Sequence, residues 1–411
     1  MFKSIYPYTQ ELIAEYEEHT EKEIATKLLT GEKAYREMLK IPLDKRREWM
    51  AGIAKSMRDN VTEHATLITR EMGKTLKEAT AEVLKCATTI DYYVENIASI
   101  LQPRMIRSDA QKSYVSYEPK GIILAIMPWN FPYWQVFRFA IPNILAGNAG
   151  ILKHASNVSG CALAIEKLFA ESGFPMGAFQ SVLLSSKNIE PIIADPRIQG
   201  VTLTGSTPAG KSVAALAGKY IKKTVLELGG SDPFIVLKDA DILEAAKTAV
   251  QGRMQNAGQS CIAAKRWIVE QPVLDAFTAA VTDIIKGLKQ GDPMLESTNM
   301  GPMARPDLAE DLARQLQESV QQGSKLVLGG AYEGCNFAPT LLTGVTADAT
   351  ASGRKHLDRW PPSSPLKTKM PPLRWQMKRN SGWVPPSGPG TWKKQPGWQH
   401  ESKAAMYLST P

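Results

Sequence analysis

The 411-residue chain has little cysteine. Its four cysteines (Cys86, Cys161, Cys261 and Cys335) stand far apart and form no CxxC pair. This spacing argues against a zinc site and against a disulfide framework, so we expect no metal centre. It fits a protein of the reducing cytoplasm, where thiols do not pair.

Long apolar runs are also missing. A membrane-spanning helix needs about 18 or more consecutive apolar residues, and no such run occurs. The opening residues, MFKSIYPYTQELIAEYEEH, carry acidic groups and lack the apolar segment of a secretory signal. We therefore expect a cytoplasmic protein with no membrane association.

The net charge of +8 belongs to the last part of the chain. Residues 352–411 hold 11 of the 49 Lys and Arg residues but only 2 of the 41 acidic ones. The preceding residues are left with 38 basic and 39 acidic groups, a net charge of −1. The same segment contains 10 of the 27 prolines and 5 of the 9 tryptophans, so two different sequences are joined near Thr350.

Hydrophobic patterning indicates an α/β protein long enough for two domains. Residues 8–100 are expected to be mostly helical, because apolar residues recur three and four positions apart. From Gly121 short apolar strands (GIILAI, GILKHA, SVLLS, GVTLT, TVLELGG) alternate with helices that begin near Pro132, Val158, Ile189 and Pro208. That alternation predicts a parallel sheet with helices on both faces.

Cys261, in NAGQSCIAAKR, is the candidate nucleophile. It follows a small, polar, glycine-containing turn, and Lys265 and Arg266 come shortly after it. Nearby cations and a helix start both favour the thiolate, which is the reactive form. A lone cysteine is more often a buried structural thiol, so the motif alone leaves both interpretations open.

Two further motifs carry polar groups that suit acyl chemistry. Glu227, in LELGGSDP, lies near the end of an expected strand, where α/β proteins place functional side chains. Asn130, in MPWNFPYWQ, stands on a turn stiffened by prolines and could donate a hydrogen bond to an oxyanion. Taken singly, the first could be a surface ion pair and the second a rigid turn.

The motifs PWNFP, TGS, LELGG and GQSC occur in this order, with Cys261 thirty-four residues after Glu227. In this combination the chain resembles the aldehyde dehydrogenase superfamily over residues 5–350. REMGK at 70–74, together with IMPWNFPYWQVFR and LELGGSDPFIV, is most similar to bacterial succinate-semialdehyde dehydrogenases. The resemblance implies a Rossmann-type cofactor domain at 1–227, with an oligomerisation hairpin at about 102–119. It also implies an α/β catalytic domain at 228–350, incomplete in this chain, and a homodimer or homotetramer.

The resemblance also implies a mechanism. The Cys261 thiolate adds to the aldehyde carbon, the Asn130 amide and the Cys261 N–H hold the oxyanion, and hydride leaves for the nicotinamide. Glu227 then activates water to hydrolyse the thioester. Arg138 matches an arginine that holds the substrate carboxylate, although a surface arginine would have the same helical spacing. A second such arginine would fall at Gln255 and is absent.

Cofactor residues follow from the same comparison. Met127, Pro128 and Trp129 are expected to line the nucleotide site, with Gly205 and Ser206 where a phosphate meets the next helix. Lys153 matches a lysine that contacts the adenosine ribose. Ser156 stands where many NAD-preferring relatives carry a glutamate, so we expect NADP, or both NADP and NAD, as cofactor.

The resemblance ends where the composition changes. Relatives continue with a segment of the form F-R-E-E-x-F-G-P-V, whereas this chain continues ASGRKHLDRWPP. Plausible codons for residues 356–361, regrouped by one base, encode T-F-G-P-V-A. Residues 379–389 and 406–411 regroup to E-T-E-F-G-L-G-A-S-I-W-T and D-V-F-V-N-S. We therefore hypothesise a one-base deletion near codon 351, which makes residues 351–411 an aberrant, disordered tail.

Three functions follow from these observations. The first is an NAD(P)-dependent dehydrogenase of succinate semialdehyde or a similar small aldehyde. The second is an inactive remnant that at most binds the nucleotide, because a segment has been lost. The third is nucleic-acid binding by the Lys-, Arg- and Trp-rich tail. We disfavour the third, because a shifted frame accounts for that composition, and expect no nucleic-acid partner.

Overall fold

The computed structural model describes residues 1–346, 349–353 and 362–366. Contacts divide the chain into a first unit, Met1–Gly229 with Gln290–Pro306, and a second unit, Gly230–Lys289 with the residues from Asp307 onward. The domain boundary predicted from the sequence puts residues 290–306 in the second domain. The contacts place this segment with the first unit, where Tyr6 donates a hydrogen bond to Asp292 (2.5 Å) and the Leu76 N–H donates to the Pro293 carbonyl (2.9 Å).

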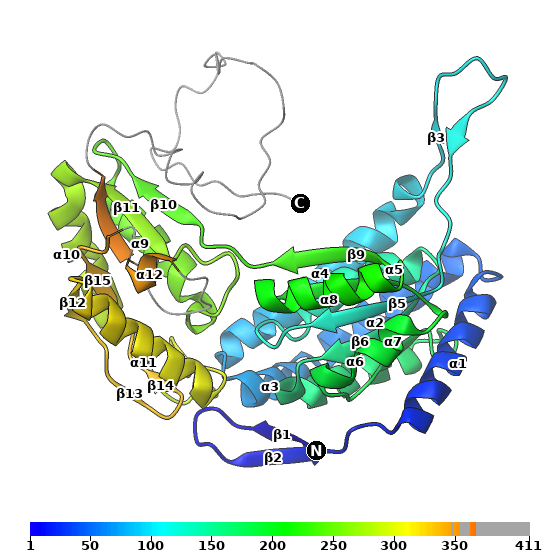
Figure 1. Cartoon of the computed structure of the whole chain (residues 1–411), viewed down its shortest axis with the longest axis horizontal. Coiled ribbons are helices and arrows are strands. Elements are labelled where there is room, and N and C mark those ends of the chain that lie inside the picture. The colour runs from blue at the N-terminus through cyan, green and yellow to red at the C-terminus, as the bar shows by residue number, and fades with distance from the viewer. Residues whose placement is uncertain (347–348, 354–361, 367–411) are drawn as a thin grey trace. The chain divides into compact units, whose positions relative to one another are not determined.

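A five-stranded parallel sheet forms the centre of the first unit, as predicted (Figure 1). Its order is β7-β6-β5-β8-β9, so the chain leaves β5 toward both edges of the sheet. The strands are β5 (Ile122–Met127), β6 (Ala149–His154), β7 (Phe179–Ser181), β8 (Ile198–Gly205) and β9 (Lys223–Leu228). The strand predicted at SVLLS (residues 181–185) lies earlier in the chain, because β7 ends at residue 181. The preceding Phe179 is buried and stacks on Phe169 with ring centroids 4.6 Å apart, which places the strand earlier.

Helices cover both faces of this sheet. On one face, α1, α7 and α8 enclose an aliphatic core with side chains from β5, β6 and β8. On the other face, α5 and α6 pack on β5 and β6, with α2, α3 and α4 outside them. The helices are α1 (Glu21–Met38), α2 (Leu43–Asp59), α3 (Val61–Met72), α4 (Leu76–Ile100), α5 (Trp134–Leu145), α6 (Ser159–Ala170), α7 (Glu190–Ala194) and α8 (Thr207–Lys219).

The first residues differ from the mostly helical segment that was predicted from residue 8. They form an antiparallel pair, β1 (Phe2–Ile5) and β2 (Leu12–Tyr16), before α1 begins. Helix α1 starts at Thr20, whose side chain and that of Glu23 cap each other's backbone N–H groups. The capping box therefore marks the real start of the helical region.

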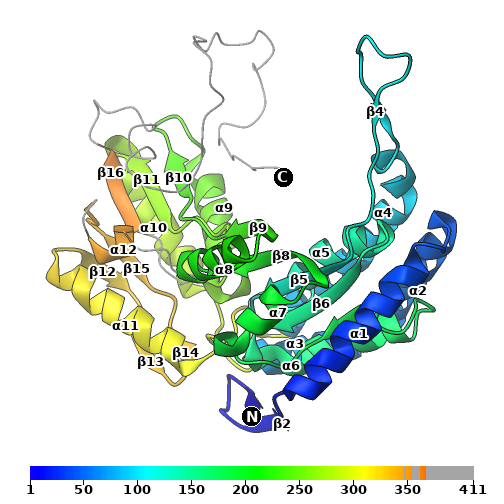
Figure 2. The same ribbon diagram turned by 45° about the vertical axis from the view of Figure 1, so that its right-hand side comes forward.

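A hairpin of β3 (Arg104–Met105) and β4 (Tyr114–Val115) extends beyond the end of α4 (Figure 2). It coincides with the predicted hairpin at 102–119. Several of its apolar side chains are exposed, among them Met105 and Tyr114. Its role in oligomerisation stays a prediction.

The second unit contains another five-stranded sheet, of order β10-β11-β16-β15-β12, in which β12 alone is antiparallel to its neighbour. Trp267 on β11 is fully buried against Phe277 on α10, edge to face at 5.7 Å. The strands are β10 (Pro233–Val236), β11 (Arg266–Glu270), β12 (Lys325–Leu328), β15 (Leu341–Thr343) and β16 (Pro362–Leu366), with the small pair β13 (Tyr332–Glu333) and β14 (Asn336–Phe337). The helices are α9 (Ile242–Met254), α10 (Leu274–Lys286), α11 (Pro306–Gln321) and the short α12 (Thr350–Gly353).

β16 occupies a central place for which its sequence is poorly suited. It pairs with β11 on one side and β15 on the other, yet it begins with Pro362 and contains Pro365. Proline has no backbone N–H and is found in edge strands rather than central ones. This mismatch is what a change of reading frame near codon 351 would produce. Within the predicted disordered tail, residues 351–353 end α12 and residues 362–366 form β16, so these parts are not disordered as predicted. The rest of the tail lies outside the described residues.

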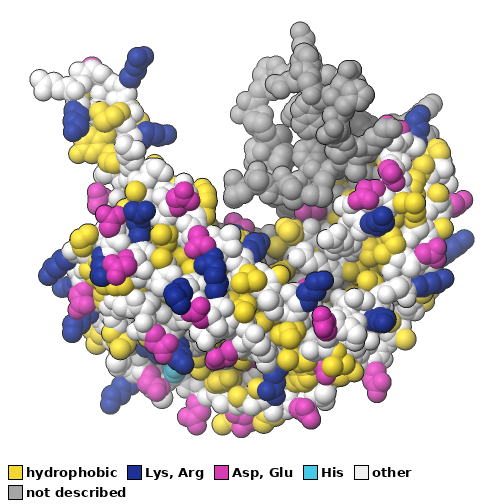
Figure 3. Space-filling view, turned by 180° about the vertical axis from the view of Figure 1, so that it is seen from behind, with side chains coloured by type: hydrophobic (Ala, Val, Ile, Leu, Met, Phe, Trp, Pro, Cys, Tyr) yellow, Lys and Arg dark blue, Asp and Glu magenta, His cyan; other side chains and the backbone are white. Residues whose placement is uncertain are grey.

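Charges of both signs are intermingled on the face of the described residues shown in Figure 3. Several exposed ion pairs among the described residues lie within one helix, such as Arg36 with Glu32 and Lys55 with Asp59. This distribution agrees with the near-neutral charge of the chain before residue 352. Within the described residues, no helix is long and apolar enough to cross a membrane.

Candidate active site

The site residues predicted in the first unit lie at one edge of its sheet. Parallel strands present their carboxyl ends at the same edge, and a ligand site forms where the chain leaves in both directions. β5 is the strand at which this happens, between β6 and β8. The residues at or just beyond the strand ends are Met127, Pro128, Trp129 and Asn130 (β5), Lys153 and Ser156 (β6), Gly205 and Ser206 (β8), and Glu227 (β9).

A buried carboxylate holds the turn that carries Asn130. Glu82 of α4 accepts hydrogen bonds from the N–H groups of Tyr133 and Trp134, both at 2.9 Å, where α5 begins. Its other oxygen pairs with the Lys74 ammonium, and both side chains are almost fully buried. Lys74 also lies over the Phe131 ring, 3.9 Å from its centroid. The carboxylate satisfies helix N–H groups that would otherwise have no partner.

His154, at the end of β6, binds the same turn from the other side. Its Nε2 lies 2.9 Å from the Pro132 carbonyl oxygen, and its Nδ1 lies 3.0 Å from the Ala155 N–H. A neutral ring with its proton on Nε2 satisfies these two contacts, and Nδ1 also lies 3.2 Å from the Met127 carbonyl oxygen. Burial lowers the pKa of His154 to about 4, so the ring is neutral at physiological pH and joins β6 to the Asn130 turn.

A second buried glutamate supports the segment after β6. Glu71, at the end of α3, accepts hydrogen bonds from the N–H groups of Gly160 (2.9 Å) and Cys161 (2.8 Å) and from the Ser4 hydroxyl (2.8 Å). Burial raises the pKa of Glu71, although the hydrogen bonds that it accepts oppose this shift. Glu71 therefore fixes the start of α6, the helix that follows Lys153 and Ser156.

The groups around Lys153 and α8 suit a phosphorylated nucleotide. Lys153 is largely buried, and its Nζ lies 3.0 Å from the Ser186 hydroxyl. Burial lowers the pKa of Lys153, and an anion beside it would favour its charged form. Ser206 caps α8 and is exposed, as is Ser156. The start of α8 can therefore receive a phosphate, and no acidic side chain stands at position 156 to repel a second one.

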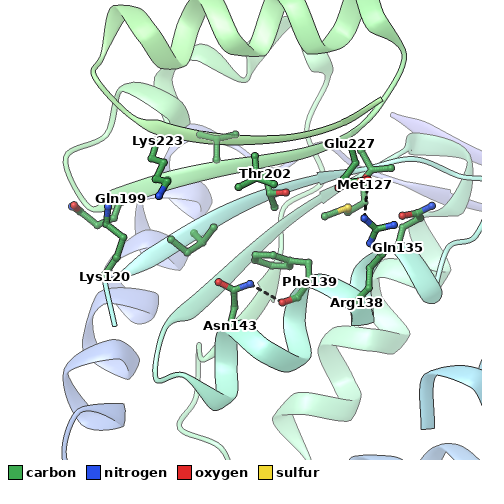
Figure 4. A pocket seen from close by; sticks show the side chains of 15 residues that line it. Lys120, Met127, Gln135, Arg138, Phe139, Asn143, Gln199, Thr202, Lys223 and Glu227 are labelled. Atoms are coloured by element: carbon green, nitrogen blue, oxygen red, sulfur yellow. Dashed lines mark hydrogen bonds and ion pairs between the residues drawn. The ribbon is translucent and has the colours of Figure 1, made fainter. Parts of the chain in front are cut away.

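Arg138 and Glu227 form an ion pair. The Arg138 Nη2 atom on α5 lies 3.0 Å from the Glu227 Oε2 atom on β9, and both side chains are partly exposed. They lie at one end of a cavity of about 260 Å³ that α5, β5, β8 and β9 enclose (Figure 4). The predicted substrate-binding arginine and the predicted base are thus in direct contact.

Cys261 lies in the second unit, in a turn and not at the helix start that was expected. β11 follows it, beginning at Arg266. Before it, Asn256, Ala257 and Gly258 all have positive φ angles (54°, 55° and 79°). Non-glycine residues rarely adopt this conformation, which is maintained only when surrounding contacts enforce it.

Side chains around the Cys261 turn supply such contacts. The Asn256 and Gln259 amides donate to each other's backbone carbonyls (3.3 and 3.2 Å). The fully buried Arg253 donates to the Gly258 carbonyl (2.8 Å). Cys261 itself is half-buried, whereas Cys86, Cys161 and Cys335 are buried, so Cys261 is the most accessible of the four thiols.

The roles of several supporting residues were not predicted from the sequence: Lys74, Glu71, Glu82, His154, Arg253, Asn256 and Gln259. One signal could have revealed Glu82. It stands within the apolar stripe of α4, with Ala79, Val83 and Cys86 at helical spacing, and a charge on a buried stripe needs a partner. The strained Asn256–Gly258 turn has no comparable signal.

Comparison with known proteins decides the family. The model of the aldehyde dehydrogenase family matches residues 1–353. The chain belongs to the aldehyde dehydrogenase family. The family model ends close to the point where the composition of the chain changes.

Individual relatives of this aldehyde dehydrogenase point the same way. A probable succinate-semialdehyde dehydrogenase (NADP+) of Synechocystis sp. is 46% identical over 349 residues, 84% of this chain and 77% of that protein. The Escherichia coli enzyme succinate semialdehyde dehydrogenase (NAD(P)+) Sad is 44% identical over 351 residues, 85% and 76% of the two chains. The crystal structure of the Streptococcus pyogenes succinic semialdehyde dehydrogenase with NADP+ superimposes with a TM-score of 0.87 at 34% identity, covering 89% of this chain and 81% of that one. The predicted fold class is confirmed.

Removing the charge of Glu82 should destabilise this aldehyde dehydrogenase strongly. In Glu82→Gln the Lys74 ammonium stays buried without its counter-ion, which costs about 3–5 kcal/mol. Glu32→Gln, which breaks an exposed pair with Arg36, should cost less than about 1 kcal/mol. Urea unfolding of both variants measures the difference. Equal effects of the two substitutions would contradict the role assigned to the buried pair.

His154 should make stability fall on acidification. Its pKa is about 4 in the folded protein and about 6.5 in an unfolded chain. The folded state therefore loses stability as the pH falls from 6.5 toward 4, by about 3 kcal/mol at most. In His154→Gln this contribution is absent, so the difference in urea midpoint between wild type and variant should shrink between pH 7 and pH 4. Parallel curves for the two proteins would show that the ring does not titrate in this way.

Proposed function

We propose that this aldehyde dehydrogenase oxidises succinate semialdehyde, or a closely similar small acidic aldehyde, with NADP as the preferred cofactor. The observation that carries the proposal is the position of Arg138, about one helix turn into α5 and in contact with Glu227. An arginine in the same cavity as the catalytic base suits an aldehyde that bears its own carboxylate. The names of the relatives from Synechocystis and Escherichia coli agree with this substrate.

The chain's own residues account for each chemical step. The Cys261 thiolate forms a bond to the aldehyde carbon, and the Asn130 amide and the Cys261 N–H donate hydrogen bonds to the resulting oxyanion. When bound, the nicotinamide supplies the acceptor for the hydride that leaves this carbon. Cys261 then holds the acyl group as a thioester. Glu227 takes a proton from water as its oxygen attacks the acyl carbon, and the Cys261 sulfur leaves as thiolate.

NADP is favoured by the surroundings of Lys153. A 2′-phosphate adds negative charge beside the adenosine ribose. The buried Lys153 ammonium is positioned to balance that charge, and Ser156 is neutral and exposed. NAD lacks the 2′-phosphate, so it would not gain from the charge of Lys153. Neither Lys153 nor Ser156 repels NAD.

The same chain could instead be an inactive remnant. The observation that favours an inactive remnant is β16, a central strand that begins with one proline and contains another. If residues after about 350 come from a shifted frame, the second unit lacks strands and helices that cover its apolar surface. Such a protein could keep the nucleotide edge of the first unit without turning over an aldehyde.

Reduction of NADP in the presence of succinate semialdehyde separates these possibilities. We expect turnover from a chain whose frame is restored by one base near codon 351, and little or none from the chain as it stands. Cys261→Ala in the restored chain should lower the rate by at least about 10³-fold, because no other nucleophile replaces the thiolate. Cys335→Ala should have little effect, because that thiol is buried in the turn between β13 and β14.

Substrate choice is tested in the same assay. If the restored enzyme oxidises butanal or hexanal but not succinate semialdehyde, the substrate assignment is wrong and the family assignment remains. If Cys261→Ala retains full activity, the mechanism is wrong.

A further inference from the structure

The Arg138–Glu227 pair joins two residues whose proposed tasks are different. Arg138 is assigned to the substrate carboxylate, and Glu227 is assigned to the water that hydrolyses the thioester. A guanidinium binds one carboxylate well in a bidentate arrangement. The Glu227 Oε2 atom lies 3.0 Å from the Arg138 Nη2 atom, so part of the guanidinium is already bound to Glu227. The Glu227 side chain is turned toward Arg138.

We propose that Glu227 stands in for the substrate carboxylate on Arg138 in the ligand-free protein, and that an acidic substrate displaces it. Binding of the substrate and release of the base are then one event. The inference rests on the proposed function and deepens it. It makes the substrate's own carboxylate the signal that frees Glu227.

The strength of the pair suits such an exchange. The Arg138 and Glu227 side chains are 34% and 52% exposed. Ion pairs with this exposure contribute about 0–1 kcal/mol, so a ligand carboxylate can replace the glutamate at little cost. The deeply buried Lys74–Glu82 pair in the same unit could not exchange in this way.

The surroundings of the pair favour an anionic ligand. Figure 4 shows Arg138 and Glu227 pointing toward each other at one end of the cavity, with Lys120 and Lys223 at the other end. Among the lining residues Glu227 is the single acidic side chain against these three basic ones. When Glu227 turns away, Arg138 faces a cavity whose remaining charges are all positive.

The competition predicts opposite effects for the two partners. Glu227→Gln removes the internal competitor and should tighten binding of a carboxylate ligand to Arg138. Arg138→Gln removes the binding group and should weaken it. After Arg138→Gln, the further change Glu227→Gln should have little additional effect, because the two side chains no longer compete.

Calorimetric titration of the full chain with 4-hydroxybutyrate tests this without requiring turnover. This probe has one carboxylate and an alcohol in place of the reactive aldehyde, and 1,4-butanediol serves as its uncharged counterpart. We expect Glu227→Gln to bind 4-hydroxybutyrate about five-fold more tightly, the equivalent of one exposed ion pair. Arg138→Gln should bind it at least about ten-fold more weakly, and binding of the diol should be unchanged in both variants.

A matched variant separates competition from a general loss of negative charge. Glu190→Gln also removes one partner of an exposed ion pair, that with Lys219 on the opposite face of the sheet. It should leave the affinity unchanged within about two-fold. In the Arg138→Gln background, Glu227→Gln should likewise change the affinity by less than about two-fold.

The possible results distinguish this inference from the proposed function. If Arg138→Gln weakens binding but Glu227→Gln does not tighten it, competition is refuted and the carboxylate site stands. If Glu227→Gln tightens binding equally with and without Arg138, the tighter binding comes from the general loss of a negative charge. Competition is then again refuted. If Arg138→Gln has no effect, or the unmodified chain and Glu227→Gln both fail to bind the probe, the carboxylate site is refuted and the exchange with it.

Discussion

Glu82 and its contacts determine the geometry of the sheet edge that carries Asn130 in the first unit. One buried carboxylate receives the Lys74 ammonium on one oxygen and two N–H groups of α5 on the other. The turn that carries Asn130 lies directly before those N–H groups, so its position follows from a contact made by α4. Glu71 does the same for α6 and the residues after β6. The two glutamates lie on either side of Gly73, whose φ of 83° ends α3 and lets the chain enter α4.

Gly73 shows how tightly this segment is built. A Cβ atom there would approach the Pro302 ring to 2.9 Å, so the segment 290–306 packs directly against the connection between α3 and α4. Tyr6 and Leu76 bind the same segment through Asp292 and Pro293. The edge of the sheet that carries Asn130 is therefore supported by residues far away in the sequence, and Arg305 of the same segment lies over the Trp129 ring, 5.8 Å from its centroid.

Much of the first unit could be predicted from the sequence, because its strands are short apolar runs and its helices have clear starts. The strand-end motifs also gave the candidate residues Asn130, Lys153, Ser206 and Glu227, and the structure places them at one edge. The supporting residues could not be found in this way. The apolar stripe of α4 could have marked Glu82, but Lys74 has no such signal, and only its contact with Glu82 shows that it is buried. The positive φ angles before Cys261 likewise depend on Arg253, Asn256 and Gln259, whose contacts periodicity does not reveal.

Hydrogen exchange at four backbone amides tests most directly whether Glu82 holds the Asn130 turn. The N–H groups of Tyr133 and Trp134 bind Glu82, and those of Gly160 and Cys161 bind Glu71. Amides at a helix start have no partner within the helix, so protection there reports these carboxylates. We predict slow exchange at all four in the unmodified protein. In Glu82→Ala, exchange should accelerate at Tyr133 and Trp134 while Gly160 and Cys161 stay protected. Equal acceleration at all four, or none at Tyr133 and Trp134, would contradict the account.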